Sequence, residues 1–343
     1  MSNPTGVTCH DPDQAWTGYT LFCETFPAPP AEGDADFPIY LIDMDGQIVH
    51  TWTVRRSLQS YCRLLPSGNL LVPTHDRSEL STGNVCISEL TPDSECVWNF
   101  RCRTDHDVQV LENGNLLINT IGEGFCPPLG KGLKRHPYVI EVTREKDVVG
   151  EWRGEEQLEE LRDLLPAEHW QHVLDRAHHD IPFDWAHNNT VQVIGVNQAH
   201  ERERAAGGPE RFRPGNFLIS YRSNDVIAVV ERPSGRIVWA WGPGELDGQH
   251  KPHMLPTGRI LIFDNGTLRK QSRVIELDPL SGEIAWEYTG APDHTFYTHC
   301  ISGAQRLPNG NTLICDGMNA RLVEVTGAKD IVWERSEEHT SEL

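Results

Sequence analysis

Short apolar runs and turn residues alternate along the whole chain, and one pattern of them recurs. Each copy has a β-prone run, a turn with Gly, Asp or Lys, and a second run that ends in tryptophan. Two β-rich runs around a short turn are typical of a β-hairpin. The copies end in Trp52, Trp98, Trp152, Trp239, Trp286 and Trp333. We therefore expect six hairpins of one kind, whose tryptophans pack between neighbouring repeats.

A second hairpin pattern, built on a turn glycine, precedes five of these six hairpins. Most of its glycines are followed by Asn and then by an apolar run, and they are Gly68, Gly114, Gly215, Gly258 and Gly310. A tight hairpin turn requires positive φ, which glycine adopts at little cost. Two consecutive hairpins make a four-stranded unit of about 45 residues, which is the repeat length of a β-propeller blade.

The two patterns together predict an all-β fold, a six-bladed β-propeller that forms a single domain over residues 1–334. Complete blades are expected over 61–100, 106–153, 187–241, 250–288 and 299–334. The sixth blade begins at Tyr19 and includes the Trp52 hairpin.

Two insertions and a tail interrupt this repeat. Leucines at helical spacing among acidic residues predict a surface helix within the first insertion, about 154–184. The second insertion, about 195–213, reads as a polar loop. The last residues, 335–343, match the translation of a common sequencing-library adapter, so we expect them to be foreign to the natural chain.

Charge and cysteine usage narrow the possible partners. Lys and Arg number 30 against 50 Asp and Glu, so the formal net charge is −20. An acidic surface repels nucleic acid and anionic membranes, and an anionic substrate would need a local cluster of Arg and His. The sequence has no apolar run long enough to span a membrane and no signal-peptide pattern at its start. Its nine cysteines never form a CxxC pair, so we expect reduced thiols, no metal site and a cytoplasmic location.

Three histidines precede the turn glycines at similar spacing. His106 lies eight residues before Gly114, and His250 lies eight before Gly258. His187 lies 28 before Gly215, a surplus that the second insertion accounts for. We predict that these histidines share one register on the innermost strands of three blades and line the central channel, where propellers usually bind ligands. The alternative is that they are structural histidines bound to nearby backbone.

Polar neighbours accompany these histidines. Asp107 follows His106, Gln249 precedes His250, and Asn189 lies two residues after His187, on the same face of an extended strand. Arg222 follows the next hairpin and offers a planar fork of donors to sulfate or phosphate oxygens. A further candidate at the channel rim is His179, in the segment 178–180.

Taken together, these motifs resemble the arylsulfotransferase-like (aryl-sulfate sulfotransferase) propeller family. The resemblance covers the chain from about Gly18 to Glu334, and it is carried by the stretches 41–52, 106–115, 185–189, 248–250, 263–266 and 307–311. The characterised enzymes of that family move a sulfuryl group from a phenolic sulfate ester to another phenol. They use a transiently sulfurylated histidine and need neither phosphoadenosine-phosphosulfate nor another cofactor.

The resemblance also implies roles for individual residues. The Gln-His motif before Phe-Asp-Asn-Gly carries the nucleophile, which is His250 here, beside Gln249. The His-x-Asn motif corresponds to His187 and Asn189, and the His-Asp motif to His106 and Asp107. The arginine after the following hairpin corresponds to Arg222, and the implied partners are a small aryl sulfate and a phenol.

Two other functions remain open from the sequence. One is a channel-based polysaccharide lyase that uses His and Arg. The other is a propeller that binds a ligand or a protein without catalysis. Release of a phenol from an aryl sulfate would distinguish the first reading from both of these.

Overall fold

The computed structural model describes residues 5–23, 37–54, 57–58, 61–75, 85–177 and 183–337. The chain divides into two compact units, and each is considered by itself. Unit 1 contains Met1–Trp16, Gly122–Tyr138 and Trp152–Leu343, and unit 2 contains Thr17–Ile121 and Val139–Glu151.

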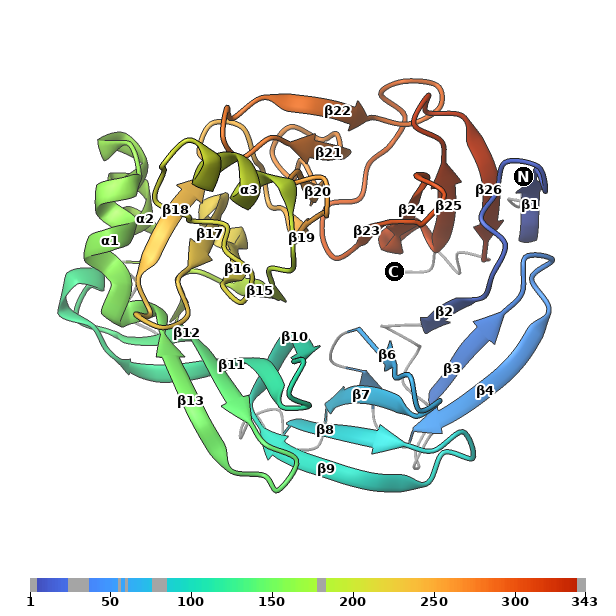
Figure 1. Cartoon of the computed structure of the whole chain (residues 1–343), viewed down its shortest axis with the longest axis horizontal. Coiled ribbons are helices and arrows are strands. Elements are labelled where there is room, and N and C mark those ends of the chain that lie inside the picture. Colours follow the sequence, from blue (N-terminus) through green and yellow to red (C-terminus); the bar gives the residue numbers. More distant parts are fainter. Residues whose placement is uncertain are drawn as a thin grey trace. The chain divides into compact units, whose positions relative to one another are not determined.

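The strands form six sheets of antiparallel neighbours, labelled in Figure 1. The first has β2 (Thr20–Cys23), β3 (Phe37–Ile42) and β4 (Ile48–Val54), and the second has β5 (Ser57–Leu58), β6 (Arg63–Leu64), β7 (Leu70–His75), β8 (Val85–Leu90) and β9 (Cys96–Cys102). The third has β10 (Thr104–Val110), β11 (Leu116–Phe125), β12 (Leu133–Val142) and β13 (Val148–Arg153), with β14 (Phe183–Asp184) parallel to β12.

The other three sheets repeat the same order of strands. The fourth has β15 (Asn188–Val193), β16 (Phe217–Tyr221), β17 (Val226–Val230) and β18 (Ile237–Trp241), and the fifth has β19 (His250–Met254), β20 (Ile260–Asp264), β21 (Arg273–Leu277) and β22 (Ile284–Tyr288). The sixth has β23 (Gly303–Arg306), β24 (Thr312–Asp316), β25 (Arg321–Val325) and β26 (Ile331–Ser336). The chain is therefore an all-β, six-bladed β-propeller, as predicted.

Helical segments are short and lie between the strands. They are η2 (Pro127–Leu129), η3 (Gly154–Gln157), α1 (Leu158–Leu164), α2 (Ala167–Ala177), α3 (Gln198–Ala205), η4 (Arg222–Asn224) and η5 (Gly317–Asn319). The first insertion is helical as predicted, and it buries Leu158 and Leu161 while α1 contacts β18. None of the helices in the described part of the chain is long and apolar enough to cross a membrane.

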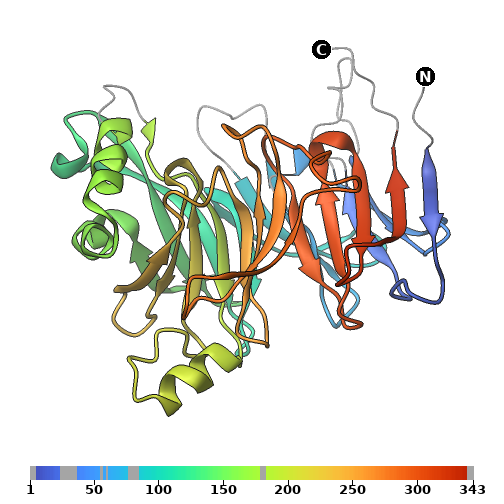
Figure 2. The same ribbon diagram turned by 90° about the horizontal axis from the view of Figure 1, so that it is seen from above.

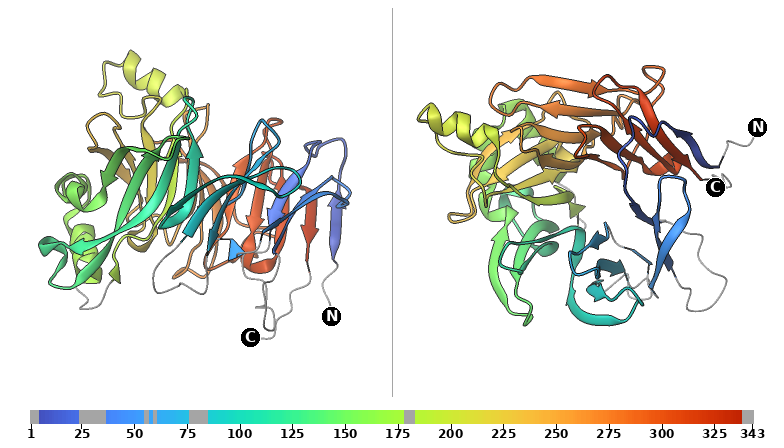
Figure 3. Two further views of the ribbon diagram at one scale, coloured as in Figure 1. Left: turned by 90° about the horizontal axis from the view of Figure 1, so that it is seen from below. Right: turned by 45° about the vertical axis from the view of Figure 1, so that its right-hand side comes forward.

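The second insertion differs from the predicted polar loop, because much of it forms α3. Asn197 caps this helix, since its side chain accepts a hydrogen bond from the His200 N–H at 2.9 Å. Ala199 is fully buried, and the backbone of α3 approaches Gly258 so closely that no Cβ would fit there. The body of the helix projects beyond the ends of the neighbouring strands (Figures 2 and 3). The polar composition of this segment concealed a helix that is held by its cap, by buried Ala199 and Glu203, and by ion pairs of Glu203 with Arg211 and of Arg202 with Asp278.

The structure also contains an N-terminal strand that was not predicted, since the first strand was expected at Tyr19. Strand β1 (Gly6–His10) pairs with β26 as a fifth, outer strand of the sixth sheet (Figure 1). Strand β26 includes Arg335 and Ser336 of the predicted foreign tail, and they pair with β1 and β25 through the backbone. Backbone pairing depends little on side-chain identity, so the origin of the tail stays a prediction.

The tryptophans pack between blades, as expected. Trp52, Trp152, Trp239 and Trp333 are buried, and Trp239 packs in one cluster with Met254 and Ile260 of the next blade. In addition, Trp98, Trp152 and Trp286 each donate an indole N–H to a carbonyl in the outer hairpin turn of the next blade, and the acceptors are Arg144, Gly235 and Gly327. Each such tryptophan thus fixes one blade to the turn of its neighbour.

Replacement of Trp152 tests how much such a hydrogen bond contributes to the free energy of unfolding. The indole N–H lies 2.7 Å from the Gly235 carbonyl oxygen and the ring is 7% exposed. Trp152→Phe keeps most of the apolar contact but loses the donor, so we expect the free energy of unfolding to fall by about 1 kcal/mol. Trp152→Ala also opens a cavity and is expected to cost about 3–5 kcal/mol. Denaturant unfolding of both variants measures the two losses; a Trp152→Phe variant as stable as the wild type would show that the hydrogen bond contributes nothing separable.

Candidate active site

His250 is the most buried of the three predicted catalytic histidines. It begins β19 opposite Phe263 of β20 and is 5% exposed. Its Nδ1 lies 2.6 Å from the Asn265 Oδ1 and 3.1 Å from the Gly248 carbonyl oxygen. Both neighbours are oxygen atoms, so the ring is oriented through Nδ1.

Asn265 lies in a tight loop after β20 that the sequence reading did not include in the site. Gly266 has φ +66, and an added Cβ there would meet the Gln271 carbonyl. Only glycine avoids this clash in the left-handed region. The Gly266 N–H also donates to the Asp247 carbonyl at 2.8 Å, so the loop is tied to the segment before His250.

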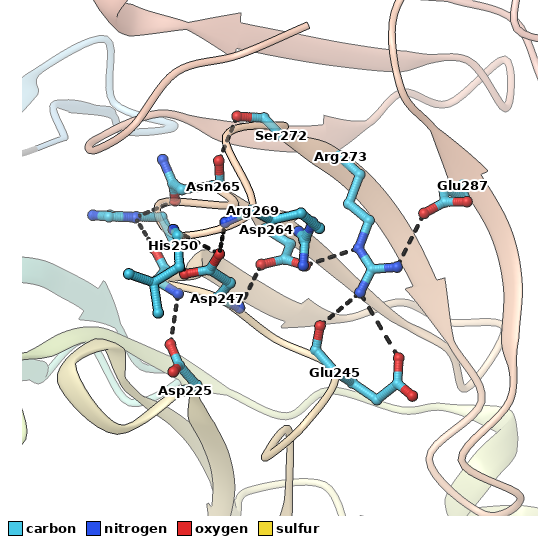
Figure 4. A network of polar contacts seen from close by, with 12 residues as sticks. Asp225, Glu245, Asp247, His250, Asp264, Asn265, Arg269, Ser272, Arg273 and Glu287 are labelled. Atoms are coloured by element: carbon cyan, nitrogen blue, oxygen red, sulfur yellow. Dashed lines mark hydrogen bonds and ion pairs between the residues drawn. The ribbon is translucent and has the colours of Figure 1, made fainter. Parts of the chain in front are cut away.

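A buried carboxylate, Asp264, anchors the same loop (Figure 4). It is fully buried, and its Oδ2 lies 2.8 Å from both Arg269 Nη2 and Arg273 Nε. Burial by itself lowers the pKa of Arg273, but hydrogen bonds and charges of Asp264 and Glu287 outweigh it and raise that pKa. These two arginines are therefore engaged in holding the loop.

His187 lies just before β15, in the left-handed region with φ +49. Its Nδ1 lies 3.0 Å from the Asp184 Oδ2, and its backbone N–H donates to the Asp184 Oδ1 at 2.8 Å. The side chain is 33% exposed. A histidine whose Nδ1 faces a carboxylate, with its ring partly open to solvent, is an arrangement suited to carrying protons.

Arg222 lies next to His187 through its backbone. It begins η4, and its backbone N–H donates to the His187 carbonyl at 3.2 Å. Within the described residues its guanidinium makes no hydrogen bond or ion pair. Burial raises the pKa of the Cys300 thiol, and the positive charge of Arg222 acts in the opposite direction. Arg222 is thus a cation available to an anionic ligand.

Asn189 and Gln249 link the two neighbouring blades. Both are buried, and Asn189 Nδ2 donates to the Gln249 carbonyl at 2.8 Å. The Gln249 side chain donates to Ser220 Oγ at 3.1 Å and to the Val226 carbonyl at 3.0 Å. These contacts bring the start of β15 close to His250, but the Gln249 amide nitrogen is turned into the blade. The predicted direct contacts of both residues with substrate stay untested.

The predicted common register of the three histidines is wrong for His187. Leu111, Ile194 and Leu255 close equivalent hairpins, each by donating its N–H to the residue after the turn glycine. His106 and His250 lie five residues before Leu111 and Leu255, whereas the residue five before Ile194 is Asn189. The second insertion is therefore shorter than the extra spacing between His187 and Gly215 that it was expected to explain. As a result, His187 lies two positions before the place that corresponds to His106 and His250. It precedes the strand and does not share a strand face with Asn189.

His106 and Asp107 belong to unit 2. His106 has φ +61 and its Nδ1 lies 2.7 Å from the Asp105 Oδ1. Asp107 is buried, and its Oδ1 accepts hydrogen bonds from the Val108 N–H at 2.9 Å and from Gln109 Nε2 at 3.3 Å. His106 thus repeats the His–carboxylate pairing of His187, while Asp107 is engaged with its own strand. Their convergence with the other histidines on one channel stays a prediction.

The remaining expectations concern His179, metal sites and the cysteines. His179 lies outside the described residues. Among the residues that are described, no three His, Cys, Asp or Glu side chains are grouped to hold a metal ion. All nine cysteines are described, and none of them forms a disulfide.

Asp225 provides a test of the electrostatics around the site. Burial raises the pKa of its carboxyl, the hydrogen bond from the Gly248 N–H lowers it, and the charges of Asp247 and Asp264 raise it again, with a net rise. Folding therefore favours the protonated form, so this group's contribution to stability falls as pH rises through its folded-state pKa.

Asp225→Asn keeps an oxygen for the Gly248 N–H and tolerates the residue's left-handed φ of +55, but removes the charge. We expect a melting temperature a few degrees higher at pH 7, with the difference shrinking in acid. The control Asp225→Ala also loses the acceptor and is expected to melt lower than Asp225→Asn. A pH-independent difference between wild type and Asp225→Asn would contradict the assignment.

In unit 1, therefore, the candidate residues come from three consecutive blades, and their convergence on one ligand stays a prediction. His187 and Arg222 come from the fourth sheet, His250 and Asn265 from the fifth, and Cys300 from the segment before β23. The sequence reading identified His187, Arg222 and His250 but missed Asp184 and Asn265, the partners that orient the two rings. Asn265 was visible in the Asp-Asn-Gly motif, which is read most simply as a turn.

Comparison with known proteins identifies the family to which the chain is similar. The family model described as arylsulfotransferase (ASST) matches residues 90–338. No curated protein matches the chain. A protein of unknown function from Bacteroides caccae is similar in structure, with 13% identity, 94% of each chain covered and a TM-score of 0.56. The periplasmic gluconolactonase PpgL of Pseudomonas aeruginosa has 12% identity, 93% and 94% coverage and a TM-score of 0.49. At 13% identity the likeness to the Bacteroides caccae protein concerns the fold alone.

Proposed function

Because the chain belongs to the arylsulfotransferase family, we propose that it transfers a sulfuryl group from a phenolic sulfate ester to a phenolic acceptor. In this proposal His250 is transiently sulfurylated, and no nucleotide sulfate donor takes part. The observation that carries the proposal is the orientation of His250, whose Nδ1 faces two oxygen atoms. A neutral ring held in this way has its lone pair on Nε2, where it serves as a nucleophile.

The first step forms one bond and breaks one. The Nε2 lone pair of His250 attacks the sulfur atom, and the electrons of the bond between sulfur and the phenolic oxygen leave with that oxygen. His187 supplies the proton that the departing phenolate takes up. Its Nδ1–H stays on Asp184, whose negative charge stabilises the ring while it is protonated.

The second step reverses these roles. His187, now neutral, takes the proton of the acceptor phenol, whose oxygen attacks sulfur while the electrons of the N–S bond return to His250 Nε2. Dividing one displacement into two lets a single histidine serve both donor and acceptor.

Arg222 would stabilise the sulfuryl group during both steps. Its guanidinium has no ion pair within the described part of the chain, and its backbone is bonded to that of His187. A planar fork of donors fits two oxygen atoms of a sulfuryl group, and charge on those oxygens changes during transfer. The net charge of −20 makes such a local cation more important, because the overall field repels an anionic ester.

Incubation with a chromogenic aryl sulfate tests the proposal. With a phenol acceptor and no nucleotide, we expect release of the chromogenic phenol and formation of a new sulfate ester. Without acceptor, intact-mass analysis should show a gain of one sulfuryl group per chain. Absence of both phenol release and the mass gain would contradict the proposal. Screening uronate-containing glycans for an ultraviolet-absorbing product tests the lyase alternative in parallel.

A further inference from the structure

Asn265 has a side chain whose orientation is fixed by its own donors. Its Nδ2 donates to the Thr298 carbonyl at 2.9 Å and to the Ile301 carbonyl at 3.0 Å. A carbonyl oxygen cannot donate, so the amide nitrogen must face these two groups. The Oδ1 therefore faces His250 Nδ1, 2.6 Å away.

This geometry determines which nitrogen of His250 carries hydrogen. Asn265 Oδ1 and the Gly248 carbonyl are both acceptors, so Nδ1 must be the protonated atom. We infer that Asn265 is a positioning residue that holds His250 in the Nδ1–H tautomer and keeps its ring neutral between turnovers. The inference rests on the proposed function only for its catalytic consequence.

The neutral amide of Asn265 as the Nδ1 partner distinguishes His250 from the other two predicted catalytic histidines. His187 and His106 each place Nδ1 against a carboxylate, of Asp184 and Asp105 respectively. A carboxylate stabilises a doubly protonated ring, which is useful for a proton carrier. The same partner beside a nucleophile would favour a proton on Nε2 and so remove the lone pair that attacks.

The amide also affects how readily the sulfuryl group leaves. When Nε2 forms a bond to sulfur, the ring gains positive charge while Nδ1–H remains bonded to Asn265. An adjacent carboxylate would stabilise that charged ring and slow the second displacement, in which the N–S electrons return to Nε2. A neutral acceptor orients the ring without this stabilisation, so the intermediate stays short-lived.

The surroundings make Asn265 a rigid support. The residue is fully buried, and Ser272 Oγ donates to its backbone carbonyl at 2.6 Å. Ser272 Oγ also accepts the Thr298 N–H at 2.8 Å, so both loops that flank the amide meet at one hydroxyl. Figure 4 shows Asn265 between Ser272 and His250, with Asp264 and its arginines to the right.

Two substitutions separate orientation from charge. Asn265→Asp retains an oxygen for His250 Nδ1 and introduces a negative charge, and it also replaces the amide donor to the Thr298 and Ile301 carbonyls by an oxygen. Asn265→Leu keeps a similar shape and removes the acceptor. The control Thr267→Val removes the hydrogen bond from Thr267 Oγ1 to the His299 carbonyl, which joins the same two loops but involves neither Asn265 nor His250. Neighbouring charges stay the same in all variants, and they are Asp225, Asp247, Asp264, Arg222, Arg269 and Arg273.

The first readout does not depend on sulfuryl transfer. Nitrogen-15 NMR of histidine-labelled protein reports the tautomer of each ring, and comparison with His250→Asn assigns the His250 signals. In the wild type and in Thr267→Val we expect Nδ1–H with an unprotonated Nε2. In Asn265→Asp we expect a ring protonated at both nitrogens over a wider pH range, by about one to three pH units. In Asn265→Leu we expect a mixture of tautomers.

The second readout is catalytic. The acid limb of the pH profile of kcat/KM should move to higher pH in Asn265→Asp, and the sulfurylated chain should persist longer without acceptor. A wild-type His250 in the Nε2–H tautomer, or Asn265 variants with unchanged His250 spectra, would overturn the inference. If the spectra behave as expected but wild-type chain transfers no sulfuryl group, the proposed function fails while the positioning role of Asn265 stands.

Discussion

The His250→Asn variant is expected to lose sulfuryl transfer, with kcat lower by roughly 10³–10⁶-fold, since removal of a covalent nucleophile has effects of this order. Asparagine is small and polar, so it fits the buried start of β19, but its amide nitrogen has no lone pair available to attack sulfur. Both phenol release and the gain of one sulfuryl group in intact mass should disappear together. The measurement is the initial rate with a chromogenic aryl sulfate, followed by mass analysis of the same samples.

A matched control lies on the same strand. His253 is three residues further along β19 and is half-buried, with its Nδ1 3.3 Å from the Lys251 carbonyl. His253→Asn makes the same chemical change outside the proposed machinery, so turnover should stay near that of the wild type. Normal turnover in His250→Asn would sink the assignment of the nucleophile. Equal losses in both variants would point to damage of the strand instead.

Arg222→Gln is expected to give the second-largest loss, about 10²–10³-fold in kcat, the usual effect of removing one donor to transition-state charge. Glutamine retains a donor but not the positive charge, and the guanidinium of Arg222 has no ion pair in the described structure that would explain it as a structural group. Arg222→Lys restores charge without the planar fork and should recover only part of the rate.

Arg236→Gln serves as the comparison for this charge. Arg236 lies in the outer hairpin of the same blade, is 67% exposed and pairs with Glu160 at 3.5 Å. Its loss changes the net charge equally but should leave kcat/KM unchanged. If Arg222→Gln behaved like Arg236→Gln, the cation would have no part in binding the sulfuryl group.

The repeat was predictable because its signals are local. A turn glycine needs positive φ, and a blade tryptophan ends each outer hairpin, so both features recur in the sequence at the period of the fold. The Asn after the glycine has a further structural role that the spacing did not reveal. Asn69, Asn115 and Asn311 each donate to a glutamate in the third strand of the same blade, Glu89, Glu141 and Glu324.

The elements that escaped prediction depend on distant partners. Strand β1 is defined by pairing with β26, more than 300 residues away. Helix α3 depends on the cap at Asn197 and on the close approach to Gly258. Strand β26 and Gly258 lie outside these segments, whereas the cap Asn197 lies inside the second one and was a local signal that the prediction overlooked.

The candidate site was assembled from residue types and motifs, which do not determine its geometry. His250, His187 and Arg222 were selected from motifs, and unit 1 places them on adjoining strands and turns. The register of His187 was misplaced because an inserted segment was assumed to carry the whole surplus. The pairing of His250 with Asn265 could not be predicted from spacing, since it depends on hydrogen bonds that a third segment, Thr298 to Ile301, makes to the amide.

The hydrogen bonds from the blade tryptophans to the outer turns imply that outer and inner turns differ in how much change of length they tolerate. The outer turns at Arg144, Gly235 and Gly327 must present one carbonyl at a fixed position, so their length cannot vary freely. The inner turn between Ile194 and Gly215 carries a whole helix and still closes its hairpin. A peptide tag or binding loop grafted onto this scaffold therefore belongs at the inner turns, where added length leaves the contacts between blades intact.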